Sequence, residues 1–144
     1  MDIRQALRTV LINDAAVFAL VGENIYGGKL PLRVTAPSIV FRLEETNDIP
    51  ILNSPGVSNL TKSVFRFGAV ARGDAIEAYD ISIDIDIAMR AALHGFRGEV
   101  SNGESPETTI QIRGAWRVDA KDFYDDLTET YWVRSDWEIH HALA

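Results

Sequence analysis

The chain has 144 residues, a hydrophobic fraction of 47%, a charged fraction of 24% and a net charge of −7. This length and composition predict one globular domain over residues 1–144 that buries about 70% of its unfolded surface. Because the chain has no cysteine, a disulfide framework, a thiolate zinc site and a cysteine nucleophile are excluded. No apolar run approaches the roughly 20 residues of a membrane span, and the N-terminus lacks a signal-peptide pattern, so we expect a soluble protein.

The negative charge is concentrated toward the C-terminus. Residues 1–45 carry five acids and five bases, residues 46–100 carry seven and five, and residues 101–144 carry nine and four, so the last segment has a net charge of −5. Binding to nucleic acid is driven largely by the exchange of protein cations for counterions. An acidic C-terminal third therefore argues against binding to a phosphate backbone.

The first part of the chain predicts two short helices. Asp2 and Gln5 have the spacing of a capping box. The residues that follow repeat an apolar face at helical spacing: Ile3, Ala6, Leu7, Val10 and Leu11. Asp14 is expected to cap a second helix over residues 15–21, which Gly22 ends.

Four segments alternate apolar and polar side chains, which predicts strands. They are residues 38–45, 62–72, 109–119 and 130–141. Because each has one apolar face, we predict an α+β fold, with a mostly antiparallel sheet of about four strands and helices packed on one face. In this alternation Trp116 and Trp137 fall on the core face, whereas Trp132 and Arg134 fall on the polar face.

Residues 73–96 carry two conflicting patterns. Asp or Ser alternates with Ile over residues 80–87, which is typical of a strand. Asp74 and Glu77, however, have capping-box spacing, and residues 88–93 strongly favour a helix. We predict a helix, which would supply the cover that the sheet needs.

The first candidate metal site consists of Asp80, Asp84 and Asp86. Whether these residues form a strand or a helix decides whether their carboxylates can bind one ion. On a strand the three carboxylates would share one face, as in a magnesium-dependent nuclease. On a helix only Asp80 and Asp84 are neighbours, and they are expected to form a solvated face. The helix prediction therefore disfavours a metal-dependent phosphoesterase, which stays open as the enzymatic alternative.

A second acidic group lies between the last two predicted strands. Its carboxylates are Asp119, Asp122, Asp125, Asp126 and Glu129. Their spacing does not match a calcium-binding EF-hand loop, so a solvated acidic turn is favoured over a calcium site. Since the carboxylates repel one another, we expect the segment to face an aqueous lumen or a basic partner surface in an assembly.

Other motifs for catalysis or metal binding are weak. His140 and His141 are adjacent on a predicted strand and would point to opposite faces, so they cannot jointly hold one ion. Gly27–Gly28 lacks the lysine and hydroxyl residue of a phosphate-binding loop, and no GxSxG or HExxH motif is present. We predict no catalytic, cofactor-binding or metal-ligating residue.

A long predicted loop over residues 46–60 is instead the first candidate for protein contacts. It contains apolar residues that have little local core available to bury them: Ile49, Ile51, Leu52 and Val57. Loops of this length in a compact domain are usually functional or mobile. Together with Trp132 and Arg134, these side chains form the predicted protein interface.

In chain order, these blocks resemble the phage tail terminators, also called tail-completion or tail-to-head joining proteins. Members of that family occur in long-tailed phages, prophages and gene transfer agents. The resemblance is carried by DAAVFALVGENIYGG at 14–28, APSIVFRLEE at 36–45, KSVFRFGAVAR at 62–72, MRAALHGFRG at 89–98 and TYWVRSDWEIHH at 130–141. It covers nearly the whole chain and depends on the order and spacing of the blocks. Residues 80–86 depart from the family's plainer alanine-rich helix.

The resemblance implies a homo-hexameric ring at the head-proximal end of the tail tube, where it ends tube polymerisation and joins the tail to the neck. The implied partners are further copies of the chain, the tail tube protein and a neck or stopper protein, and DNA would pass through the channel without specific binding. The resemblance also implies assembly in the host cytoplasm, a final location in the virion, and no membrane, catalysis or cofactor. Another connector component, such as a stopper or adaptor, and a monomeric binding module stay open.

Overall fold

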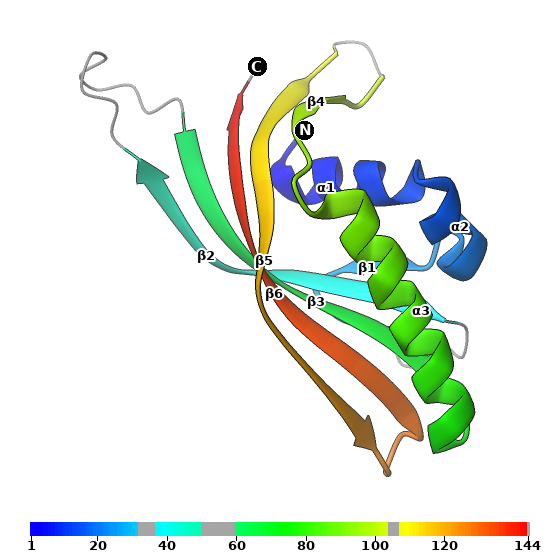
Figure 1. Ribbon diagram of the computed structural model, residues 1–144. Coiled ribbons are helices and arrows are strands. Elements are labelled where there is room, and N and C mark those ends of the chain that lie inside the picture. The colour runs from blue at the N-terminus through cyan, green and yellow to red at the C-terminus, as the bar shows by residue number, and fades with distance from the viewer. Residues whose placement is uncertain (32–36, 50–59, 104–106, 144) are drawn as a thin grey trace.

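The computed structural model describes residues 1–31, 37–49, 60–103 and 107–143. Its elements in chain order are α1 (Ile3–Ile12), α2 (Ala15–Val21), β1 (Ile25–Gly27), β2 (Ser38–Ile49), β3 (Leu60–Arg72), α3 (Ala75–Leu93), β4 (Gly98–Ser101), β5 (Thr109–Asp125) and β6 (Thr130–Leu143). The strands form a curled sheet with the helices on one side (Figure 1). No helix in the described residues is long and apolar enough to cross a membrane.

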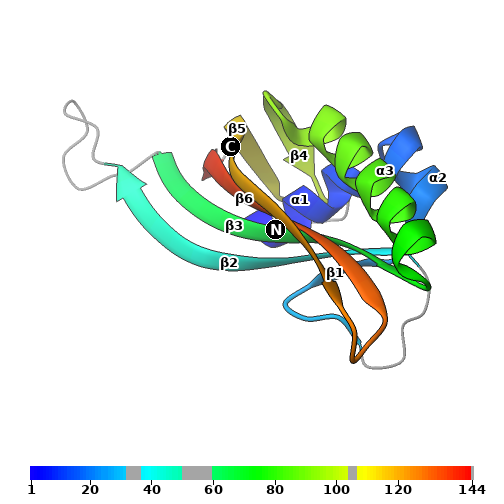
Figure 2. The ribbon, with the colours of Figure 1, turned by 60° about the horizontal axis from the view of Figure 1, so that its bottom comes forward.

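The sheet has six strands in the order β1-β2-β3-β6-β5-β4. β1 pairs with β2 in parallel, and the other neighbours pair antiparallel. The prediction of about four mostly antiparallel strands was therefore wrong. β1 has three residues and β4 has four, which is too short for an alternating pattern to be recognised in the sequence. Figure 2 shows how the sheet curls, with the helices on its concave side.

The hydrophobic core lies between this concave face and the helices. Phe41 and Phe67 stack with ring centroids 5.4 Å apart, and Trp137 meets Phe67 edge-on at 6.1 Å. Trp137 is fully buried, and its indole N–H donates to the hydroxyl of Ser135 at 2.9 Å, so the buried donor is satisfied. The predicted core faces of residues 38–45, 62–72 and 130–141 are confirmed.

The two N-terminal helices begin as predicted. Asp2 and Gln5 form a complete capping box at the start of α1. The Asp14 carboxylate accepts hydrogen bonds from the first turn of α2, and Gly22, with φ 57°, caps the end of that helix. The Asp2 and Asp14 carboxylates accept from backbone N–H groups that have no partner inside the helix, whereas the Gly22 N–H donates to the Phe18 carbonyl.

The segment over residues 73–96, which carries both a strand and a helix pattern, contains a helix of 19 residues, α3, as predicted. Its buried side recurs at helical spacing: Ala78, Ser82, Ile85, Met89 and Leu93. The alternating isoleucines are therefore spread around the helix, and Ile76 and Ile87 are 78% and 60% exposed. Asp80 and Asp84 lie at exposed positions, whereas Asp86 is buried, so the three carboxylates do not share a face.

Asp86 is buried because it pairs with Arg117 of β5. The guanidinium lies 3.0 Å from the carboxylate, and the two side chains are 13% and 9% exposed respectively. Within the described residues, Asp86 Oδ1 and Arg117 Nε have no hydrogen-bond partner. Burial raises the pKa of Asp86, although Arg117 and then Arg90 oppose the shift. The ion pair thus ties α3 to the sheet at the expense of incomplete hydrogen bonding.

The pairing of β5 with β6 contains two irregularities, at Ile112/Gly114 and at Arg117/Asp119. The first reverses the alternation, so Ala115 is fully buried while Trp116 is 43% exposed on the opposite face. The prediction that Trp116 belongs to the core was therefore wrong. Gly114 accommodates the displaced ring, because a Cβ at this position would lie 2.5 Å from the Trp116 indole.

At the other end of the sheet, His141 of β6 is a half-buried titratable group. Its Nε2 lies 2.9 Å from the hydroxyl of Ser63. Burial lowers the pKa of His141; Asp48 raises it and His140 lowers it further. Since the folded-state pKa is depressed, the neutral ring contributes stability above pH about 6.5, and that stability is lost as the pH falls.

We therefore expect His141→Gln to reduce the pH dependence of folding. Between about pH 7.5 and about pH 5.5, the thermal unfolding midpoint of the unmodified chain should fall further than that of the variant. Calorimetry at several pH values measures both. Parallel curves for the two chains would show that His141 does not contribute to the pH dependence.

Candidate interaction surface

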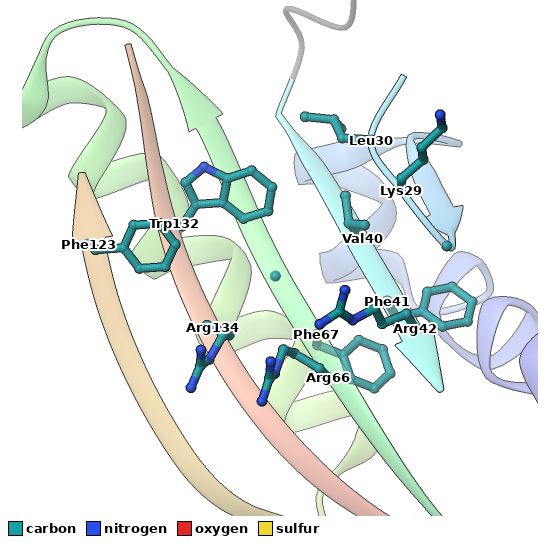
Figure 3. Close-up of a pocket in the computed structure, with 12 residues that line it drawn as sticks. Lys29, Leu30, Val40, Phe41, Arg42, Arg66, Phe67, Phe123, Trp132 and Arg134 are labelled. Carbon is teal, nitrogen blue, oxygen red and sulfur yellow. The ribbon is translucent and has the colours of Figure 1, made fainter. Parts of the chain in front are cut away.

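The face of the sheet that points away from the helices carries a hollow of about 340 Å³, here called the sheet-face groove (Figure 3). Strands β2, β3, β5 and β6 and the residues after β1 contribute to it. Its apolar lining includes Leu30, Val40, Phe123 and Trp132, and its basic lining is Lys29, Arg42, Arg66 and Arg134. The groove therefore combines an apolar floor with cationic side chains.

Gly68 makes the floor of the groove possible. The indole of Trp132 lies over this residue, and a Cβ there would be only 3.0 Å from the ring. The ring also stacks on Phe123, with centroids 6.2 Å apart and an interplanar angle of 5°. Its N–H donates to the hydroxyl of Thr130 at 2.8 Å. Trp132 is thus held flat along the sheet, with one edge lining the groove.

Two of the four cations are already neutralised by carboxylates on the same face. Arg66 lies 3.0 Å from Asp136 and 3.8 Å from Glu44, and Arg42 lies 2.6 Å from Glu44. The hydrogen bond with Asp136 is the main cause of the raised pKa of Arg66. These contacts fix the positions of both guanidinium groups.

The other two cations remain available. Within the described residues, neither Lys29 nor Arg134 has an ion pair or a side-chain hydrogen bond. Arg134 also lies directly opposite Lys121 in the register of β5 and β6. Like charges at directly opposed positions are destabilising. An anionic group that binds to this part of the sheet face would therefore reduce the electrostatic repulsion between these cations.

Of the predicted interface residues, Trp132 and Arg134 both line the groove. Ile49 is the last residue of β2, and Ile51, Leu52 and Val57 lie outside the described residues. The sequence did not single out Lys29, Arg42, Arg66 or Phe123. The alternation placed Arg42 and Arg66 on polar strand faces, but only the strand order brings them beside Trp132.

The predicted acidic connection is shorter than expected. Asp119, Asp122 and Asp125 belong to β5, and only Asp126 and Glu129 lie in the turn before β6. The Asp122 carboxylate accepts a hydrogen bond from the Tyr131 hydroxyl, which raises the pKa of Tyr131 to about 12. The prediction that the whole segment forms a turn was therefore wrong, because the hairpin continues through Asp125. Asp119, Asp122, Asp126 and Glu129 are nevertheless exposed to solvent, as predicted.

Within residues 1–31, 37–49, 60–103 and 107–143, no group of three or more His, Asp or Glu side chains is arranged to hold a metal ion. His140 contacts Glu138 at 3.0 Å and the ring of Trp116 at 4.9 Å, whereas His141 contacts Ser63. The two adjacent imidazoles thus have different surroundings, as strand geometry requires.

No protein-family model matches this chain, and no curated protein is a match either. Among solved structures, a chain from the virion of a native gene transfer agent particle has the same fold, with a TM-score of 0.68 and 16% sequence identity. The similarity covers 99% of this chain and 95% of that chain. At this level of identity the comparison defines the class of fold, over essentially the whole length of both proteins.

Proposed function

We propose that this chain is a structural protein of a virion, which forms a hexameric ring at the head-proximal end of a tail tube. In this role the ring ends tube polymerisation and joins the tail to a neck protein. The observation that carries the proposal is the fold similarity to a gene transfer agent virion chain across 99% of this chain. The resemblance of the ordered sequence blocks to the tail terminators supports the same role and is the reason for proposing this position in the tail.

The exposed apolar side chains fit a protein that assembles. Several of them lie on the β5–β6 hairpin, including Val118 at 58% and Leu127 at 96% exposure. A second set lies on α3, where Ile76 and Ile87 are exposed. Exposed apolar residues that gather on particular elements mark protein contacts more often than residues scattered singly. A ring subunit needs such surfaces for its neighbours and for the tube.

The charge also fits a channel for DNA. A net charge of −7 gives the ring a predominantly negative potential, and a wall that repels phosphate does not retain DNA by charge. In this proposal DNA passes without specific binding, and the protein holds no cofactor and catalyses no reaction.

The test is binding of the purified protein to assembled tail tubes. We expect the purified protein to attach at one tube end and to stop further elongation, because the ring covers the surface to which the next tube subunit would add. Electron microscopy of tube ends and measured tube lengths give the two readouts. Binding to the head connector without binding to tubes would instead identify a stopper or adaptor, and no binding to either would overturn the proposal.

A further inference from the structure

We propose that the sheet-face groove receives the hairpin apex, residues 125–129, of a second copy of this chain. The inference rests on the ring proposed above and names the contact between adjacent subunits. It combines two surfaces that lie on different parts of the molecule, carry opposite charge and each contain apolar side chains. One is the hollow over Gly68, and the other is the turn between β5 and β6.

The hairpin apex is a fixed projection with an apolar tip. Leu127 is 96% exposed, and its backbone N–H donates to the Asp125 carboxylate at 3.0 Å. The base of the turn is attached to the start of α3, because the Gly73 N–H donates to the Glu129 carbonyl at 3.0 Å. A projection that is already ordered loses little conformational entropy when it binds.

The charges of the two surfaces are opposite. Asp125, Asp126 and Glu129 place carboxylates on both sides of Leu127 in the sequence. The groove presents Lys29 and Arg134, for which the described residues supply no carboxylate partner. Contact between the surfaces would relieve the repulsion within each of them. Leu127 would meet the apolar lining while the carboxylates meet the cations.

An apex that occupies this groove belongs to another copy, because the apex cannot reach the groove of its own chain. Phe123 and Trp132 are direct partners in the β5–β6 ladder, and the ladder continues without a break to Asp125 and Thr130. The apex therefore projects past the groove along the same rigid hairpin, beside the start of α3 (Figure 1). Contact between two different surfaces of identical chains is head-to-tail, and it produces a ring when the rotation closes.

Charge reversal tests this contact in the full chain. The groove variant is Lys29→Glu with Arg134→Glu, and the apex variant is Asp126→Lys with Glu129→Lys. Each should raise the protein concentration needed for half-maximal ring formation by at least about tenfold, since like charges then face each other. The chain that carries all four substitutions should return to within about threefold of the unmodified protein, because every reversed groove then meets a reversed apex. Native mass spectrometry and sedimentation velocity measure the assembly.

Two further variants keep the test decisive. Arg97→Glu is the matched control, since it reverses an exposed cation that does not line the groove, and it should leave assembly unchanged. Leu127→Ser alters only an exposed tip, so it should preserve the thermal unfolding midpoint and weaken ring formation by about tenfold. It provides the same information if a charge-reversed chain does not fold.

Rings that form normally in both the groove variant and Leu127→Ser would overturn this inference and leave the proposed function intact. A groove variant that forms normal rings but no longer binds tail tubes would assign the groove to the tube protein, which also overturns the inference. Failure of the unmodified chain to form rings, alone or on tubes, would instead overturn the proposed function.

Discussion

Replacing Asp86 with alanine is expected to lower the free energy of unfolding by about 3 to 5 kcal/mol. The substitution leaves the Arg117 guanidinium, which is only 13% exposed, without the carboxylate that neutralises it. A buried charge without a partner is far less stable than the same charge in water. Urea unfolding of the two chains, followed by circular dichroism, measures the difference.

The matched control is Asp84→Ala on an exposed position of the same helix, which should change stability by less than about 0.5 kcal/mol. The double variant Asp86→Leu with Arg117→Met should recover most of the lost stability, because an apolar pair needs no hydrogen bonds. The present pair already leaves Asp86 Oδ1 and Arg117 Nε without partners among the described residues. A loss below about 1 kcal/mol for Asp86→Ala would show that water reaches the pair and screens it.

Trp137→Ala is expected to destabilise the fold by about 3 to 5 kcal/mol. The side chain is fully buried and packs against Phe67 and His94, so its removal leaves a large cavity. Trp116→Ala is the matched comparison, and we expect it to cost less than about 1 kcal/mol because Trp116 is 43% exposed. Thermal and urea unfolding of the two variants measure the contrast.

The comparison tests the irregular register of β5. If the alternation of residues 109–119 were regular, Trp116 would be buried like Trp137, and the two substitutions would have similar effects. Equal losses would therefore contradict the register shift at Ile112/Gly114. A small loss for Trp116→Ala alone would support it.

The elements that could be predicted are those whose signals are local. Helix caps such as Asp2 and Asp14 act within one turn, and long strands such as β3 and β6 repeat their pattern many times. β1 and β4 could not be predicted, because three or four residues contain no usable period. The bulge before Gly114 could not be predicted from the sequence either, since a bulge is defined by the pairing with the partner strand and not by β5 alone.

The candidate surface could be predicted only in part for the same reason. The alternation of apolar and polar side chains along β6 predicted that Trp132 and Arg134 lie on the polar face, and the structure places them there. Lys29 and Phe123, however, join them only through the order β1-β2-β3-β6-β5. That order depends on contacts between residues far apart in the sequence, which a pattern of sizes and charges does not encode.

The most direct test of the proposed ring is electron microscopy of the purified protein, imaged alone and after mixing with tail tubes. We predict closed rings with six-fold symmetry, formed by 16.0 kDa subunits and located at one end of the tubes. Only monomers of 16.0 kDa in both samples, with bare tube ends, would contradict the account.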